Sequence, residues 1–345
     1  MPKKLTLLWQ TPGSHLVDWV HEIFAPIIGD QVVDGKHKIV LDNCLVVDTQ
    51  LHLAPPEYYP QFRGKNVFLM REPDEYFRDI SGVYVNFCGV FRMHHSNVFR
   101  PERVLSIPLG YGNGLARMGE PKRASQRSYV WSMLGQMNKS TRPDALKALI
   151  SIKPNFWFAA DGWQIGSGTA ASNASSHKPK ENYRQLQAES IFSPAPMGNV
   201  QQETNRPYEA LECGAIPLLE KQWFMEVHKS LLGSHPLPTF SSWSKAADFV
   251  RETIKDPAAL DQLQAECLAW WHSYKLALTA DVVSFTERHW EKPPGSKSEF
   301  VKWYGRIPGW ALFELARHHN VSAFRRRVVR HVRRLIEHGR FFERV

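Results

Sequence analysis

The stretch from Ser190 to Leu219, SIFSPAPMGNVQQETNRPYEALECGAIPLL, constrains the fold of this chain more than any other. Its apolar start predicts a buried strand that Pro194 and Gly198 end. Helical spacing of apolar residues follows from Asn205 to Cys213, and the run 215–219 predicts a second strand. A strand, a loop, a helix and a strand in this order are typical of a parallel α/β sheet.

Polar residues at the start of that helix are suited to a phosphate and a ribose. A helix that begins at the carboxyl ends of parallel strands presents free N–H groups and the positive end of its dipole, which favours phosphate. Arg206 lies in the first turn. Glu209, one turn later on the same face, is placed to accept hydrogen bonds from ribose hydroxyls, and Glu212 is the competing candidate. The alternative is an ordinary amphipathic helix with an exposed Arg206–Glu209 pair.

The string RPYEALECGAIPLL resembles the C-terminal donor-binding motif of exostosin-type glycosyltransferases, in which an arginine, a tyrosine-glutamate-alanine-leucine step, a glycine and an isoleucine-proline follow in this order. The match is specific over this stretch and diffuse from Tyr129 to about Trp271, and the first half of the chain resembles the family only in pattern. Members usually carry a cysteine-proline-arginine-glycine type of loop, where this chain has SPAPMGN without an arginine.

The resemblance implies the GT-B fold, an α/β fold of two Rossmann-like domains that face a central cleft. It implies an inverting glycosyltransferase that moves a sugar from a nucleotide-diphosphate donor, expected to be a uridine diphosphate sugar, to a glycan acceptor in bacterial surface polysaccharide or lipopolysaccharide synthesis. No cofactor is expected beside the donor substrate. In this stretch the donor-binding residues would be Pro194, Gly198, Asn205, Arg206, Glu209 and Glu212.

A second basic site for the donor is predicted upstream. The apolar strand 128–134 breaks at Gly135 and leads past Lys139 into a helix that opens near Arg142. Glycine permits a close approach of the backbone to a ligand. In related glycosyltransferases the corresponding glycine and arginine reach the donor pyrophosphate, which makes Gly135, Lys139 and Arg142 candidate donor-binding residues. The alternative is a plain strand-turn-helix with solvated charges.

Glu72 is the candidate catalytic base. It follows the apolar strand 65–70 at its carboxyl end, where sites of α/β proteins lie. The surrounding REPDEYF faintly resembles the glutamate-containing strand end of fucosyltransferase-like GT-B enzymes. Asp74 and Glu75 are close enough to take the role instead. His94 and His95 are alternative bases, of which at most one can face the cleft, and His94 is also a candidate acceptor-binding residue. Glu72 as a mere turn carboxylate is the alternative.

Tyr111 and Asn113, in the glycine-rich segment after the strand 104–108, are candidate acceptor-binding residues, with a tight turn as the alternative. No DxD-like motif stands at a strand end, so a metal-independent transfer is expected. In such a transfer the departing diphosphate would be held by Arg142, Arg206 and a helix N-terminus.

Length and composition favour two globular α/β domains. The chain has 345 residues, 43% of them hydrophobic and 22% charged, which suits two domains of ordinary size. The polar, aperiodic stretch GEPKRASQR predicts the interdomain linker. The expected organisation is an N-terminal acceptor-side domain over 1–118, a linker over 119–127, a C-terminal donor domain over 128–292 and a basic helical extension over 293–345.

The start of the chain shows no signal-peptide pattern, no long apolar run occurs, and the four cysteines form no CxxC pair. A cytoplasmic protein without a structural zinc site or disulfides is therefore expected. The small polar segment 166–179 predicts a loop, and late helices are expected near 243–254, 257–276 and 280–290. The 280–290 helix or the tail is the candidate for the late helix that crosses back to the N-terminal domain in GT-B enzymes.

The C-terminal tail carries most of the net charge of +9, because nine arginines face two glutamates from Arg317 to Arg344. Apolar residues at helical spacing between them predict a basic amphipathic helix, which could lie on an anionic membrane surface and place the protein at the inner face of the membrane. A solvated terminal helix is the alternative. The rival function is a noncatalytic protein that binds an anionic ligand or nucleic acid through this tail; against nucleic acid, no nucleic-acid-binding motif is found.

Overall fold

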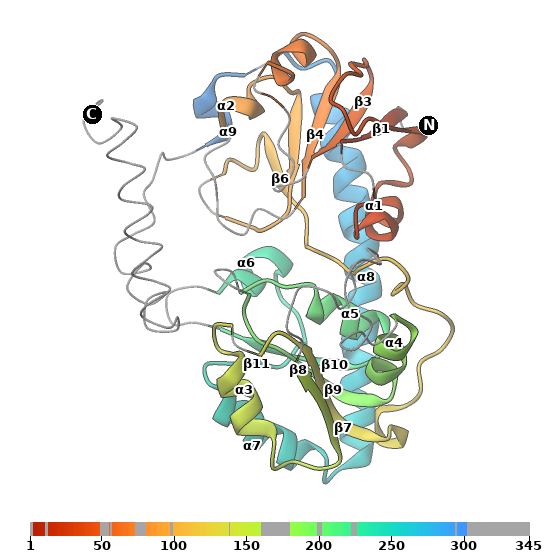
Figure 1. The fold of residues 1–345 in the computed structure, drawn as a ribbon, viewed down its shortest axis with the longest axis vertical. Helices are drawn as coiled ribbons and strands as arrows, with labels where there is room; N and C mark the ends of the chain where they lie inside the picture. Colours follow the sequence, from red (N-terminus) through yellow and green to blue (C-terminus); the bar gives the residue numbers. More distant parts are fainter. Residues whose placement is uncertain are drawn as a thin grey trace, which may run out of the picture.

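Two α/β domains, each built on a parallel sheet, make up the computed structural model of the chain (Figure 1). This arrangement confirms the predicted fold class. The structure describes residues 3–10, 13–48, 55, 57–72, 81–96, 99–137, 139–159, 180–198, 202–221, 226–293 and 295–301. The predicted loop 166–179 and the basic tail lie outside these residues, as do Asp74 and Glu75.

The N-terminal sheet has six parallel strands in the order β2-β1-β3-β4-β5-β6. Its central strands β3 and β4 are buried at every position, because helices and loops cover both faces of the sheet, as in most parallel sheets. The strands β2 and β5 were not expected from the sequence. The elements are β1 (Leu5–Trp9), α1 (Val17–Phe24), β2 (Ile28–Val33), β3 (Cys44–Asp48), β4 (Val67–Arg71), α2 (Ser81–Tyr84), β5 (Gly89–Arg92) and β6 (Val104–Ser106).

The C-terminal sheet has five strands in the order β11-β10-β9-β7-β8. The prediction that Pro194 ends the first strand of the motif was wrong, because Pro194 lies inside β9 and pairs with Leu218 of β10. The elements are β7 (Tyr129–Gly135), α3 (Arg142–Leu149), β8 (Asn155–Ala159), α4 (Lys180–Ala188), β9 (Ser190–Ala195), α5 (Arg206–Glu212), β10 (Ile216–Glu220), α6 (Val227–Leu232), β11 (Thr239–Phe240) and α7 (Trp243–Thr253).

One long helix, α8 (Pro257–His289), runs along both domains (Figure 1). The sequence was expected to form two helices here, and this prediction was wrong. In the N-terminal domain Phe285 of α8 packs on Phe91 of β5 with 5.1 Å between ring centroids. A Cβ atom at Gly89 would lie 2.7 Å from the Phe285 ring, so only glycine permits this contact. The short helix α9 (Lys297–Phe300) follows on the same domain.

A buried cluster of polar and aromatic groups joins α1, α5 and α8. Lys275 of α8 lies 2.6 Å from a carboxylate oxygen of Glu22 and 2.7 Å from one of Glu212. The indole N–H of Trp271 donates to the same Glu212 oxygen at 2.6 Å. The second oxygen of Glu212 accepts from the backbone N–H of Arg117 at 2.7 Å. Both carboxylate oxygens of Glu212 are thus engaged in holding the domains together.

Replacing Trp271 by alanine is expected to lower the free energy of unfolding by about 3–5 kcal/mol. Its fully buried ring stacks between Trp19 of the N-terminal domain and Tyr208 of the C-terminal domain, with centroid distances of 5.8 and 5.4 Å. Urea unfolding measures the loss. The control is Leu276→Ala on the same helix, where the side chain is 61% exposed and the change should stay within about 0.5 kcal/mol. Equal losses in the two variants would contradict this role.

None of the helices in the described part of the chain is both long and apolar enough to span a bilayer.

Candidate donor and acceptor site

The carboxyl ends of the strands of both sheets meet at the junction of the domains. Glu203, between β9 and α5, accepts a hydrogen bond of 2.8 Å from the backbone N–H of Leu109, which follows β6. Asn205 donates through its side-chain amide to the carbonyl of Gly110 at 3.0 Å and of Leu109 at 3.3 Å. In open α/β sheets ligands bind at this edge, so a ligand here would contact both domains.

Two guanidinium groups converge at Gly135, the last residue of β7. Gly135 has φ +126°, and a Cβ atom there would overlap Nη2 of Arg206 and lie 4.0 Å from Nη1 of Arg142. Arg142 also donates to the carbonyl of Gln136 at 2.9 Å, which holds its side chain at the strand end. The sequence placed these arginines in separate segments, and the fold brings them together around a backbone without a side chain. Such a pair suits a diphosphate.

The loops that carry these arginines are tied by Glu220 at the carboxyl end of β10. One Glu220 oxygen accepts from the hydroxyl of Thr141 at 2.5 Å and from the backbone N–H of Met197 at 3.3 Å. Thr141 directly precedes Arg142. Glu220 was missed by the sequence analysis; its only signal is its place at the end of an apolar strand, the same signal that selected Glu72.

The remaining donor candidates of these loops lie close to the same edge. Gly198 is buried just past the end of β9. The side chain of Pro194 is buried within β9. Lys139 is half-buried in the loop before α3, and its carbonyl accepts the backbone N–H of Arg142 at 3.0 Å.

Glu209 and Glu212, the two carboxylates of α5, differ in their surroundings. The Tyr183 hydroxyl donates to Glu209 at 2.7 Å. Burial raises the pKa of Glu209, while this hydrogen bond and the charge of Arg206 act against the rise. Glu209 is therefore an oriented carboxylate beside the arginine. Glu212 differs from Glu209, because both of its carboxylate oxygens accept hydrogen bonds from groups at the domain junction, namely Trp271, Lys275 and the backbone of Arg117. These contacts support a structural role for Glu212.

Glu72 directly follows β4 at its carboxyl end and is 2% exposed. The hydroxyl of Ser14, just before α1, donates to it at 2.5 Å. Burial is the largest cause that raises the pKa of Glu72 to about 7; Asp48 raises it further, while Ser14 and Arg71 lower it. A carboxyl group that titrates near neutral pH can take up a proton from an acceptor hydroxyl.

The predicted acceptor residues Tyr111 and Asn113 both contact α1. The Tyr111 hydroxyl donates to Glu22, and its ring packs edge-on against Trp19 at 5.6 Å. Asn113 accepts from the backbone N–H of Asp18 at 3.1 Å and donates to the carbonyl of Ser14 at 2.8 Å. These contacts match the turn that was the alternative in the sequence analysis.

His94, the other acceptor candidate, lies at the domain junction. It has φ +59°, which is uncommon for a residue with a side chain. Its Nδ1 atom faces a Glu203 oxygen at 3.8 Å. Burial, and then the charge of Arg92, lower the pKa of His94 to about 3. The ring is therefore neutral at physiological pH.

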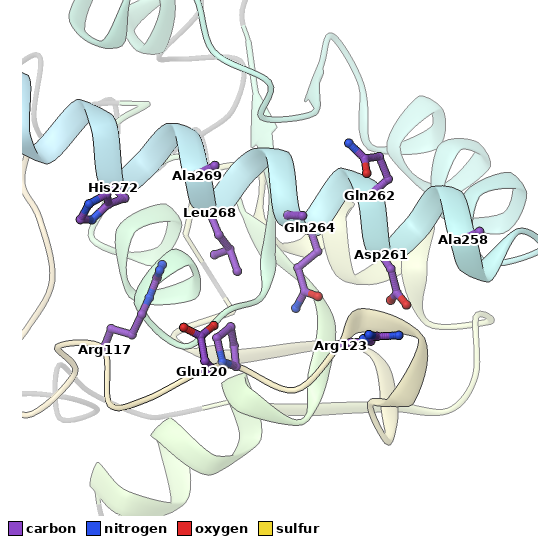
Figure 2. Close-up of a pocket in the computed structure, with 12 residues that line it drawn as sticks. Arg117, Glu120, Arg123, Ala258, Asp261, Gln262, Gln264, Leu268, Ala269 and His272 are labelled. Atoms are coloured by element: carbon purple, nitrogen blue, oxygen red, sulfur yellow. The ribbon is translucent and has the colours of Figure 1, made fainter.

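Among the described residues no cluster of three or more metal-ligating side chains occurs. A hollow of about 630 Å³ lies between the linker and α8 (Figure 2). It is lined by polar groups such as Arg117, Glu120 and His272, and Arg117 contacts the carbonyl of Leu211 near the C-terminal end of α5. Arg206 is at the other end of that helix. The hollow is therefore separate from the arginine pair.

No protein-family model and no curated protein sequence matches the chain. Solved structures that resemble it include an alpha1,3-fucosyltransferase, at 11% identity and a TM-score of 0.47, over 82% of this chain and 91% of that one. T4 phage BGT in complex with UDP and Mn2+ is similar at 11% identity and a TM-score of 0.46, over 83% of this chain and 98% of that one. Anabaena HepE in complex with UDP is similar at 12% identity and a TM-score of 0.47, over 83% of this chain and 100% of that one. With TM-scores below 0.5, these likenesses decide nothing about what this chain binds.

Proposed function

We propose that this protein is a glycosyltransferase that moves a sugar from a nucleoside diphosphate donor to a hydroxyl group of an acceptor. The observation that carries the proposal is the convergence of Arg142 and Arg206 on the bare backbone of Gly135 at the carboxyl end of β7. Two guanidinium groups at one point can neutralise the charge of a departing diphosphate. Glu209, oriented by Tyr183 beside Arg206, supplies an acceptor for ribose hydroxyls.

In the proposed reaction the carboxylate of Glu72 takes the proton of the acceptor hydroxyl. The acceptor oxygen forms a bond to the anomeric carbon, the bond from that carbon to the phosphate oxygen breaks, and the diphosphate leaves with the electron pair. Attack from the side opposite the leaving group inverts the anomeric carbon. The raised pKa of Glu72 supports its role as base, because a base is most effective when its pKa is near the working pH.

The resemblance of residues 206–219 to exostosin-type enzymes supports a uridine diphosphate sugar as donor and a bacterial surface glycan as product. The proposed transfer is metal-independent, with the arginine pair in the place of a metal. The basic sequence from Arg317 to Arg344 supports a membrane surface as the place of an acceptor linked to a lipid.

A thermal-shift panel of uridine, guanosine and cytidine diphosphates tests the proposal. A ligand that binds only the folded state raises the unfolding midpoint, and at 100 times its Kd it adds about 2.7 kcal/mol to stability. We expect one diphosphate to stabilise the protein strongly and the corresponding nucleoside to stabilise it little. No shift with any of the three would instead favour the noncatalytic anion-binding alternative, which predicts salt-sensitive binding through the basic tail.

A further inference from the structure

We propose that Glu203 and Asn205 are positioning residues that fix the arginine of the donor site against the acceptor domain. The inference rests on the proposed function and goes beyond it, because the role lies in contacts with the other domain and not in contacts with a substrate. Both residues come just before Arg206 in the chain, and both bind the backbone of the other domain.

The contacts form a clamp on two consecutive residues. Glu203 accepts the backbone N–H of Leu109 at 2.8 Å, and Asn205 donates to the carbonyls of Leu109 and Gly110. Both backbone polar groups of Leu109 are thus satisfied by side chains of the other domain. The hydroxyl of Tyr208, in α5, donates to the same Glu203 oxygen at 2.9 Å and so ties the clamp to the helix that begins with Arg206.

The clamped segment is itself fixed to the rest of the acceptor domain. Gly110 has φ +62°, and a Cβ atom there would overlap the ring of Trp19 in α1. The indole N–H of Trp19 donates to the carbonyl of Pro108 at 3.0 Å, and the ring is fully buried. Because α1 follows Ser14, which binds Glu72, a continuous set of contacts joins Arg206 to the proposed base.

The clamp is a local contact within a much larger interface. The α8 helix packs on both domains through groups such as Trp271 and Phe285, whereas Glu203 binds the backbone of Leu109. Variants of the clamp should therefore fold, and their effect should be on the relative placement of the two domains. A displacement of about 1 Å between reacting groups can cost about 100-fold in rate.

Glutamine is the conservative replacement for Glu203. The second Glu203 oxygen faces Nδ1 of His94 at 3.8 Å. Burial raises the pKa of Glu203 to about 7, while hydrogen bonds from Leu109, Tyr208 and His95 act against the rise. Because the neutral carboxyl form is well populated near pH 7, an uncharged amide oxygen can accept the same bonds. Glu203→Gln should keep the clamp, and Glu203→Ala should remove it.

Hydrogen–deuterium exchange measures the clamp in the full-length protein. The probe is the nucleoside diphosphate that stabilises the wild-type protein most in the thermal-shift panel. In the wild type, binding at Arg206 should slow exchange of the peptide around 107–113 in the other domain by about tenfold. In Glu203→Ala this slowing should disappear while the affinity for the probe stays unchanged, and in Asn205→Ala the slowing should disappear as well. Glu203→Gln should restore it.

The control is Asn86→Ala, which removes a buried asparagine side chain of the acceptor domain whose amide donates to the carbonyl of Val83 in the same domain. It should leave the slowing intact. If either alanine variant keeps the slowing, or if Glu203→Ala loses affinity for the probe in parallel with it, the positioning role is wrong while the proposed function stands. If no diphosphate in the panel binds the wild type, the proposed function fails first and this inference fails with it.

Discussion

Replacing Glu72 by glutamine is expected to lower kcat by about 100- to 10 000-fold and to leave the affinity for the nucleoside diphosphate unchanged. The amide keeps the shape and the hydrogen bond from Ser14 but cannot take a proton from the acceptor. The proposed donor site is built on β7 and α5 of the other domain, so its arginines are untouched. Release of the nucleoside diphosphate from the donor in the presence of acceptor measures kcat.

The pH dependence separates a base from a merely structural carboxylate. A base acts only when ionised, so kcat/KM of the wild type should rise with pH and reach half its maximum near pH 7, the pKa of Glu72. The glutamine variant should lack this rise. Ser14→Ala removes a hydrogen bond that lowers the pKa of Glu72, and it should therefore move the rise to higher pH.

Stability provides the control for Glu72→Gln. The folded state raises the pKa of Glu72 from 4.5 to about 7, so it binds the proton more tightly than the unfolded chain does. This contribution to stability is complete below pH 4.5 and is lost as the pH rises through 7. At pH 8 the buried carboxylate is charged, and the neutral amide should unfold at the same or a higher temperature. Retained activity in this variant would exclude Glu72 as the base and direct attention to Asp74 and Glu75.

The sequence predicted the central strands well and the edge and short strands poorly. Strands such as β3 and β7 are nearly continuous apolar runs, because parallel strands are buried on both faces. By contrast β2, IGDQVV, is an edge strand with mostly exposed or half-exposed positions, and β5 has four residues. Neither carries enough apolar sequence to be recognised without its partners in the sheet.

The division of α8 into two helices was an error that the sequence could have prevented. After Pro257 the segment contains neither glycine nor proline up to His289. Buried positions recur at spacings of three, four or seven along its whole length, at residues 260, 264, 267, 271, 278, 282, 285 and 289, with residue 286 buried beside 285. This is one helical stripe. The helix changes its partner domain along its length without a break in its own pattern.

The residues of the candidate site differ in the same way: some are marked by a local sequence pattern, and others only by contacts with distant parts of the chain. Gly135, Arg142, Arg206 and Glu72 were selected from the sequence because each ends a strand, directly follows one or begins a helix. Glu203, which binds the other domain, and Ser14, which binds Glu72 in its own domain, lie in loops whose partners are 94 and 58 residues away in the chain. Local patterns carry no information on such distant contacts.

Arg206→Ala is expected to weaken binding of the nucleoside diphosphate by about 10- to 100-fold, because a hydrogen bond to a charged group contributes about 1.5–3 kcal/mol. Isothermal titration calorimetry measures the affinity. Arg206→Lys keeps the charge but loses the planar fork, so it should recover only part of the loss. The control is Arg251→Ala, the same change of charge on α7, where the arginine pairs with Asp248 at the surface.

A double variant of Arg142 and Arg206 tests whether the two arginines bind the same ligand, which neither single variant can show. If Arg142 and Arg206 bind the same diphosphate at Gly135, their effects are coupled, and the loss of affinity in the double alanine variant should differ from the sum of the single losses. Arg206→Ala with Arg251→Ala should be additive. Additive losses for the first pair would place the two guanidinium groups on separate ligands. Unchanged affinity in both single variants would remove the diphosphate from this site and, with it, the main support for sugar transfer.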